Sequence, residues 1–224
     1  MSDTMSDMSM MQQDLVTDER YLESFRGVPI YGVAGTNASG KDILMDIMSD
    51  YGFMVFRTSD SLRQVAHAVF KSTLRGGNDA PMGKVGNAFR AAYPGGMVEL
   101  GLLDWWLRAA VLPEDLRPKG LVIGSIRGTG EAQRLQAIGG KLIVTDADPH
   151  VRYQRVHGRG RADDNVSFEE FLEHEAGDMA VGETDPTKFG MAAVIQMGDI
   201  RITNNDNDLS AFRRQVVETL GLPS

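Results

Sequence analysis

The glycine-rich stretch GTNASGK, Gly35 to Lys41, constrains the fold more than any other part of this 224-residue chain. It follows an apolar, β-branched run (residues 28–34) and precedes a segment whose apolar side chains recur at helical spacing (residues 43–48). Strand, loop and helix in this order are the setting in which G-x-x-x-x-G-K holds phosphate. Glycines let backbone N–H groups turn inward, and the helix N-terminus adds positive charge. The stretch therefore predicts a nucleotide-binding loop.

The members of this loop are expected to contact a nucleoside triphosphate. The expected ATP-binding residues are Gly35, Asn37, Ala38, Ser39, Gly40, Lys41 and Asp42. Lys41 should reach the terminal phosphates and is also a candidate catalytic residue. Asp42 stands where a hydroxyl usually contacts magnesium, and two interpretations stay open. Either Asp42 holds a Mg²⁺ cofactor, directly or through water, or it only caps the helix.

Short apolar runs alternate with helical patterns along the rest of the chain. Strands are expected within residues 28–34, 53–60, 120–128, 141–148 and 199–204, with helices between them. Ser59 or Asp60 is expected to cap one helix, and Ser167 another. Alternation of this kind predicts a three-layer α/β fold of the P-loop NTPase class, with a parallel sheet of about five strands covered on both faces.

Composition limits the partners. The net charge of -8 argues against a general nucleic-acid binder, while four arginines within ten residues (152–161) suit a compact phosphorylated ligand. There is no cysteine, no run of 18 apolar residues and no secretion signal in the first 25 residues, which are expected to be an unpacked acidic tail. These features favour a cytoplasmic protein that does not contact membranes.

Three segments resemble the nucleoside monophosphate kinases of the adenylate kinase branch. They are TSDSLR (residues 58–63), GSIRGTGEAQRL (residues 124–135) and RYQRVHGRGRADDN (residues 152–165). The resemblance implies an acceptor site that uses Thr58, Arg63, Arg127 and Gln133, and a short lid whose arginines close over the donor. The lid arginines are Arg155, Arg159 and Arg161, followed by Asp163 and Asp164; Arg155 also counts among the ATP-binding residues. Planar guanidinium groups on a closing flap suit the spread charge of a transferred phosphoryl group.

The resemblance also divides the chain. It implies a disordered acidic tail (residues 1–26) and a kinase domain (residues 27–224) with an acceptor-binding insertion (residues 58–119) and a lid (residues 155–166). Within the insertion, GNAFRAAYPGG is similar to deoxynucleotide and dephospho-coenzyme A kinases, so Arg90 is a further acceptor contact. The family usually carries an aspartate at the end of the third strand, where Gly124 and Ser125 stand here. Either the metal-organising carboxylate has moved to Asp42, or catalysis is weakened.

The sequence therefore predicts ATP- and Mg²⁺-dependent phosphorylation of a nucleoside or deoxynucleoside monophosphate, with Lys41, Arg127 and the three lid arginines as catalytic residues. One alternative is a dephospho-coenzyme A kinase, whose hydroxyl acceptor would need a general base such as Asp60. Another is a regulator that binds nucleotide without transferring phosphate.

Several other residues are expected to have structural roles. The four histidines and the acidic segment FEEFLEHE are expected at the surface or in packing, since transfer to a phosphate needs no base. Trp105 and Trp106 are expected to pack in the core or at a dimer face. Asn204 and Asn205 could face the adenine of a nucleotide, but a simple turn is favoured.

Overall fold

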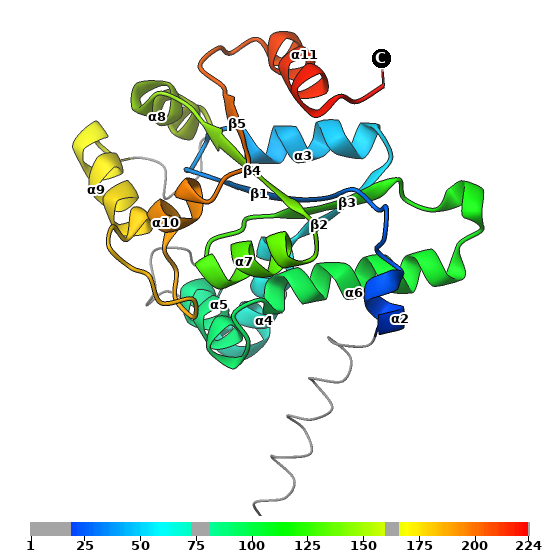
Figure 1. Cartoon of the computed structure of the whole chain (residues 1–224). Helices are drawn as coiled ribbons and strands as arrows, with labels where there is room; N and C mark the ends of the chain where they lie inside the picture. The colour runs from blue at the N-terminus through cyan, green and yellow to red at the C-terminus, as the bar shows by residue number, and fades with distance from the viewer. Residues whose placement is uncertain (1–18, 73–80, 160–165, 224) are drawn as a thin grey trace, which may run out of the picture.

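A five-stranded parallel sheet lies at the centre of the molecule (Figure 1). The structure is a computed structural model and describes residues 19–72, 81–159 and 166–223. The strands are β1 (Ile30–Gly35), β2 (Phe53–Arg57), β3 (Gly120–Gly124), β4 (Lys141–Asp146) and β5 (Ile200–Thr203). Their order across the sheet is β2-β3-β1-β4-β5, so β1 is central and carries the glycine-rich loop at its carboxyl end. This is the parallel α/β fold that the alternating pattern predicts.

Both faces of the sheet are buried, because successive strand side chains point to opposite sides. Ile30 and Ala34 of β1 join one apolar cluster with Leu142 of β4. Val33 joins the other cluster with Ile143, its register partner on β4. Strands buried on both faces appear in the sequence as continuous apolar runs. Their positions could therefore be predicted from the pattern of apolar residues.

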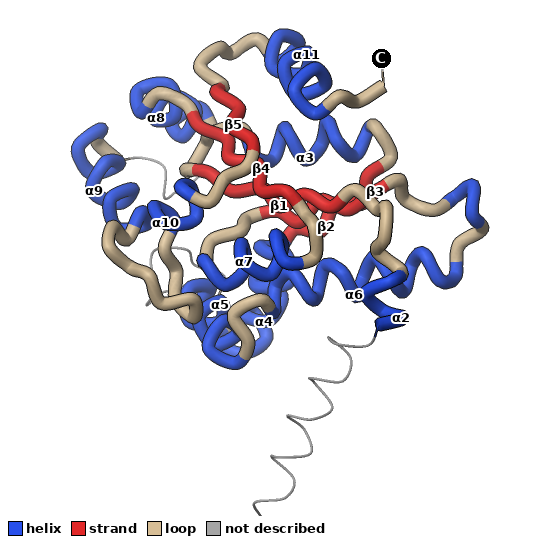
Figure 2. The backbone as a smooth tube through the Cα atoms, in the orientation of Figure 1, coloured by secondary structure: helices blue, strands red, loops and turns tan. Residues whose placement is uncertain are grey.

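Helices cover the two faces and surround the carboxyl ends of the strands (Figure 2). The longer helices are α3 (Lys41–Asp50), α4 (Thr58–Phe70), α5 (Pro81–Ala92), α6 (Gly96–Val111), α7 (Thr129–Ala137), α8 (Pro149–Gly158), α9 (Phe168–Met179) and α11 (Leu209–Leu220). Shorter ones are α2 (Glu19–Glu23), η1 (Glu114–Leu116) and α10 (Met191–Gln196). Helices α3 and α11 pack on one face, and α2, α6, α7 and α10 pack on the other. No helix in the described ranges is both long and apolar enough to cross a membrane.

The segment just before β1 differs from the expected unpacked tail. Residues 19–23 form α2, and Tyr21 and Phe25 are buried in the core. Their rings contact Trp106 and Trp105 of α6 at centroid distances of 6.0 and 5.4 Å. The tail prediction is therefore wrong from Glu19 onward, because two aromatic side chains outweigh the polar composition around them. Residues 1–18 lie outside the described ranges.

Two helix starts test the capping predictions. Ser167 caps α9, and its hydroxyl accepts from the Glu170 N–H, as expected. The cap predicted at Ser59 or Asp60 is wrong, because α4 begins at Thr58 with Arg57 at the cap position and no side-chain cap. The strand β2 ends earlier than its apolar pattern suggests, and the helix follows without a loop.

Candidate active site

The glycine-rich loop needs glycine at two positions. Gly35 and Gly40 have φ of 142° and 104°, in the region that side chains disfavour. A Cβ on Gly35 would lie 2.2 Å from the Thr145 carbonyl oxygen, and one on Gly40 would lie 2.3 Å from Asn204 Nδ2. The loop is thus pressed against β4 and the segment after β5, and only glycine fits at its two ends.

Hydrogen bonds from β4 and from the segment after β5 hold the loop in shape. The Ser39 hydroxyl lies 2.8 Å from the Thr145 hydroxyl and donates to the Thr36 carbonyl at 2.9 Å. Asn204 is buried and donates to the Ser39 carbonyl at 3.2 Å. The prediction that Asn204 only turns the chain is wrong, since its side chain contacts the loop. Ser39, expected to contact ATP, has its hydroxyl engaged within the protein.

Lys41 begins α3, and its ammonium group lies beside the loop. Nζ donates to the Gly35 carbonyl at 2.8 Å and also to the Thr36 carbonyl. Burial, together with the nearby positive charge of Arg127, lowers the pKa of Lys41 to about 7, although Asp42 opposes the shift. An anion at this position would restore the charge of the lysine, so the group is set to bind phosphate.

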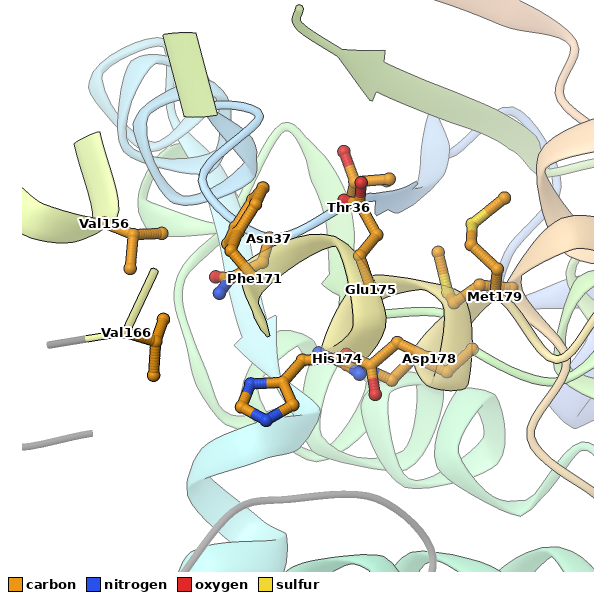
Figure 3. A pocket seen from close by; sticks show the side chains of 12 residues that line it. Thr36, Asn37, Val156, Val166, Phe171, His174, Glu175, Asp178 and Met179 are labelled. Carbon is orange, nitrogen blue, oxygen red and sulfur yellow. The ribbon is translucent and has the colours of Figure 1, made fainter. Parts of the chain in front are cut away.

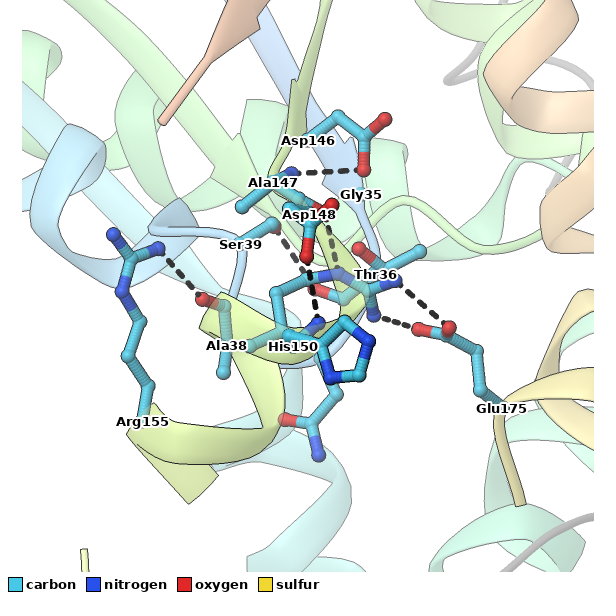
Figure 4. Close-up of polar contacts among 12 residues, drawn as sticks. Gly35, Thr36, Ala38, Ser39, Asp146, Ala147, Asp148, His150, Arg155 and Glu175 are labelled. Carbon is cyan, nitrogen blue, oxygen red and sulfur yellow. Dashed lines mark hydrogen bonds and ion pairs between the residues drawn. The ribbon is translucent and has the colours of Figure 1, made fainter. Parts of the chain in front are cut away.

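The lid arginines that the structure describes contact the loop. Arg155 on α8 donates to the Ala38 carbonyl at 3.3 Å (Figure 4). It also donates to Asn204 Oδ1 at 3.3 Å. Arg159 donates to Asn37 Oδ1 at 3.3 Å. Burial lowers the pKa of Arg155. The structure therefore brings these two arginines to the expected ATP-binding residues, while Arg161, Asp163 and Asp164 lie outside the described ranges.

A cavity of about 80 Å³ opens beside the loop (Figure 3). It is lined by Gly35, Thr36, Asn37, Arg127, Val156, Val166, Phe171, His174, Glu175, Asp178, Met179 and Met191. A volume of this size holds a few water molecules or a phosphoryl group but no nucleoside.

A second hollow, of about 390 Å³, is formed by residues 203–206 with Ala211, Phe212 and Gln215 of α11. It adjoins the loop through Asn204, on the side where the sequence resemblance places adenine.

Arg127 follows β3 and lines the first cavity. Among the described residues its guanidinium makes no hydrogen bond or ion pair, and it lies 5.2 Å from the centre of the Phe189 ring. Burial lowers the pKa of Arg127, the neighbouring charge of Arg90 lowers it further, and Asp178 opposes both. The guanidinium is half-buried at the cavity wall and has no anion within hydrogen-bond distance among the described residues, so the cavity favours a negatively charged ligand.

Glu131 of α7 holds the backbone that carries Arg127. One carboxylate oxygen accepts from the N–H groups of Arg127 and Gly128 at 2.7 and 3.0 Å. The other accepts from Arg90 Nε at 3.0 Å, and both side chains are buried. The expected role of Arg90 as an acceptor contact therefore does not match the structure, because its guanidinium pairs with Glu131. Arg90 therefore acts through Glu131, which holds the backbone of Arg127.

Helix α9 brings carboxylates to the cavity, although its acidic sequence suggests a solvated face. Glu175 pairs with both terminal nitrogens of the buried Arg152, which joins α9 to α8. Asp178 is half-buried and lines the cavity opposite the loop. Glu169, Glu170 and Glu173 are exposed, as expected. His174, expected at the surface or in packing, is exposed but also lines the cavity.

The space at Gly124 explains the missing strand-end acid. A Cβ on Gly124 would lie 2.3 Å from Met45 Sδ, so the methionine of α3 fills the place of an aspartate side chain. Ser125 then adopts φ 67°, and the Ile126 N–H returns to the Val33 carbonyl at 3.0 Å. The chain leaves the sheet in a strained turn that leads directly to Arg127.

The position of Asp42 is compatible with both of its expected roles, a magnesium contact and a negative charge at the start of α3. Its side chain is exposed in the first turn of α3, and the described residues give it no hydrogen bond or ion pair. The cap position of α3 is Gly40, without a side-chain cap, so Asp42 contributes only its charge to the helix end. No group of three acidic or histidine side chains in the described ranges could hold a metal alone. Magnesium often takes one or two carboxylates and completes its shell with phosphate and water, which Asp42 could support.

Four residues expected to contact the acceptor are not part of the cavity wall. The Thr58 hydroxyl is buried and donates to the Gly124 carbonyl at 2.8 Å, which ties α4 to β3. Arg63 pairs with Asp60 at 2.8 Å on an exposed turn of α4. Gln133 is exposed on α7. The Asp60–Arg63 pair could have been expected from the sequence, because residues three or four positions apart are neighbours on a helix.

Comparison with known proteins agrees with this fold. No protein-family model matches the chain. It is similar to a UPF0200 protein of Pyrobaculum aerophilum, with 25% identity over 198 residues that cover 86% of this chain and 97% of the relative. A UPF0200 protein of Methanosarcina barkeri is 27% identical over 197 residues, covering 85% of this chain and 94% of the relative.

Among solved structures, a shikimate kinase from Acinetobacter baumannii in complex with shikimate superposes with a TM-score of 0.53 and 12% identity. The superposition covers 89% of this chain and 96% of the kinase. The chain therefore has the fold of the P-loop kinases.

Proposed function

We propose that this protein transfers the terminal phosphoryl group of ATP to a small-molecule acceptor. The observation that carries the proposal is the pair formed by Lys41 and Arg127. Both cations are half-buried, burial lowers the pKa of each, and within the described ranges neither forms an ion pair. A phosphoryl group between the loop and Arg127 would be held from two sides, which suits the spread charge of the transfer.

The remaining loop contacts define the donor side. Arg155 and Arg159 lie against Ala38 and Asn37. They would close over the ATP phosphates, together with Arg161 of the lid. Asp42 would hold Mg²⁺, which would neutralise phosphate charge when bound. The hollow beside Asn204 is large enough for an adenine ring.

The acceptor side supports two classes. A nucleoside or deoxynucleoside monophosphate, implied by the sequence resemblance, would place its phosphate on Arg127. A hydroxyl acceptor, as in a dephospho-coenzyme A kinase, would need a carboxylate base near the cavity. A regulator that binds nucleotide without transfer is a third candidate, supported by the missing acid at Gly124.

A coupled assay of ADP formation tests the proposal. It would use ATP and Mg²⁺ with each nucleoside and deoxynucleoside monophosphate, and dephospho-coenzyme A as a parallel acceptor. We expect Lys41→Ala and Arg127→Ala each to lower kcat/KM by about a hundredfold or more, as loss of one charge-stabilising donor does. Arg108→Ala, on the exposed face of α6, is the matched control.

Calorimetric titration with ATP separates binding from transfer. Wild-type protein that binds no ATP, or binds it equally well as Lys41→Ala, contradicts the proposal. Tight ATP binding with no turnover of any acceptor, or of water, would favour the regulator.

A further inference from the structure

The acceptor side of the cavity has fewer cations than a phosphate acceptor requires. Arg63 is paired with Asp60, and Arg90 is paired with Glu131. Arg152 is paired with Glu175 through two nitrogens. Arg127 lines this cavity and has no side-chain anion in the described part of the chain, whereas Arg155 of α8 donates to the Ala38 and Asp206 carbonyls on the donor side.

Carboxylates stand in the same space. Glu175 and Asp178 project from α9 into the cavity, with Thr36 and Asn37 of the loop across from them (Figure 3). Glu175 is engaged by Arg152, whereas Asp178 has no hydrogen bond or ion pair within the described ranges. Its charge acts on both Arg127 and Lys41 without direct contact with either. The cavity therefore forms a gap between Asp178 and Arg127, which both line it.

A monophosphate acceptor and a hydroxyl acceptor require different charges in this gap. A monophosphate acceptor brings its own negative charge, and Asp178 and Glu175 would repel it. A hydroxyl acceptor brings no charge but must lose a proton, and an aspartate performs this duty in protein kinases. Asp60, the candidate base in the sequence, is exposed and paired with Arg63 away from the cavity wall.

We propose that the acceptor oxygen is a hydroxyl and that Asp178 is its general base; this rests on the proposed phosphoryl transfer. The acceptor oxygen forms a bond to the γ-phosphorus of ATP as its proton passes to the Asp178 carboxylate. The bond between that phosphorus and the β,γ-bridging oxygen breaks, and its electron pair leaves with ADP. The proton then passes to solvent. Lys41 and Arg127 stabilise the phosphoryl group as it is transferred.

Water, the smallest hydroxyl acceptor, serves as the probe because the natural acceptor is unidentified. Hydrolysis of ATP by the full chain with Mg²⁺ would be compared among wild type, Asp178→Asn, Asp178→Glu and the exposed α9 control Glu173→Gln. We expect Asp178→Asn to slow hydrolysis by about a hundredfold, within the usual range for loss of a general base. Asp178→Glu should restore part of the rate, and Glu173→Gln should match wild type. If wild type and Asp178→Asn hydrolyse ATP at equal rates, the proposal is overturned. This holds also if neither protein exceeds the uncatalysed rate.

A binding measurement tests the charge argument independently. Protein saturated with a non-hydrolysable ATP analogue would be titrated with AMP and, separately, with inorganic phosphate. We expect no saturation at millimolar concentrations in wild type and at least tenfold tighter binding in Asp178→Asn. Micromolar binding of AMP to wild type that Asp178→Asn leaves unchanged or weakens would instead support a monophosphate acceptor. Failure of wild type to bind the analogue would count against the proposed function, because Asp178 plays no part in holding ATP.

Discussion

The phosphate loop and helix α9 face the same cavity but differ in how their polar groups are engaged. In the loop, Ser39 is fixed by Thr145, Thr36 and Asn204, so its shape is set before any ligand arrives. On α9, Asp178 is free of partners in the described ranges. The difference indicates that the proposed donor side is preorganised by hydrogen bonds within the protein, whereas Asp178 on the proposed acceptor side is not held by such bonds.

The largest effect is expected where the acceptor side meets the core. Glu131→Ala would leave Arg90 buried without its anion and would free the N–H groups of Arg127 and Gly128. We expect a loss of about 3–5 kcal/mol in unfolding free energy, or a melting temperature lower by roughly 10 °C. Thermal unfolding measures this, with Glu169→Ala on the exposed face of α9 as control. Equal melting temperatures for both variants would show that the acceptor side does not depend on Glu131.

An intermediate effect is expected on the donor side, in the pH dependence of ATP binding. The pKa of Lys41, about 7 in the free protein, should rise when phosphate binds, so binding takes up a proton above that pH. The affinity for ATP should fall by up to tenfold per pH unit between about pH 7.5 and 9, since the charged fraction of a free lysine falls about tenfold with each pH unit above its pKa. Calorimetric titrations across this range measure it.

Lys41→Arg provides the control for that titration, because arginine keeps its charge throughout the range. The affinity of this variant should vary little between pH 7.5 and 9. A wild-type profile as flat as that of Lys41→Arg would mean that Lys41 stays charged in the free protein.

The smallest effect is expected at the acceptor residue that the sequence favours. Arg63 pairs with Asp60 on an exposed turn, with 40% of its side chain accessible. Such pairs contribute little, so Arg63→Ala should change unfolding free energy by less than about 0.5 kcal/mol and kcat/KM by less than twofold. The same assays as above apply. A tenfold loss of kcat/KM would place Arg63 on the acceptor and move the acceptor site toward α4.

The shape of the loop and its contact with the lid arginines could be predicted from the sequence because the pattern is local. Gly35, Gly40 and Lys41 lie within seven residues, and their spacing alone specifies a turn that binds phosphate. Arg155 and Arg159 could also be identified, since the lid segment is a continuous motif. Thr145 and Asn204 could not be identified in this way, because their contact with Ser39 spans 106 and 165 positions.

The acceptor side was predicted less well for a physical reason. An arginine in a motif can bind a ligand or pair within the protein, and only the position of its partner decides. Arg90 meets Glu131 across 41 positions, and Arg152 meets Glu175 across 23. Asp178 stands in an acidic helix whose sequence is typical of a solvated face, and its half-buried position depends on how α9 packs beside α8 and α10.

The contact between Gly124 and Met45 restricts which sequences this fold can reach by single substitutions. An aspartate at position 124 would overlap Met45 Sδ, so the end of the buried methionine side chain would have to move before the carboxylate could fit. Shortening Met45 alone would leave a cavity in the core. The effect of a substitution at either position therefore depends on the side chain at the other. A lineage that settled on methionine here would find a carboxylate for its site more readily on another helix than at the end of β3.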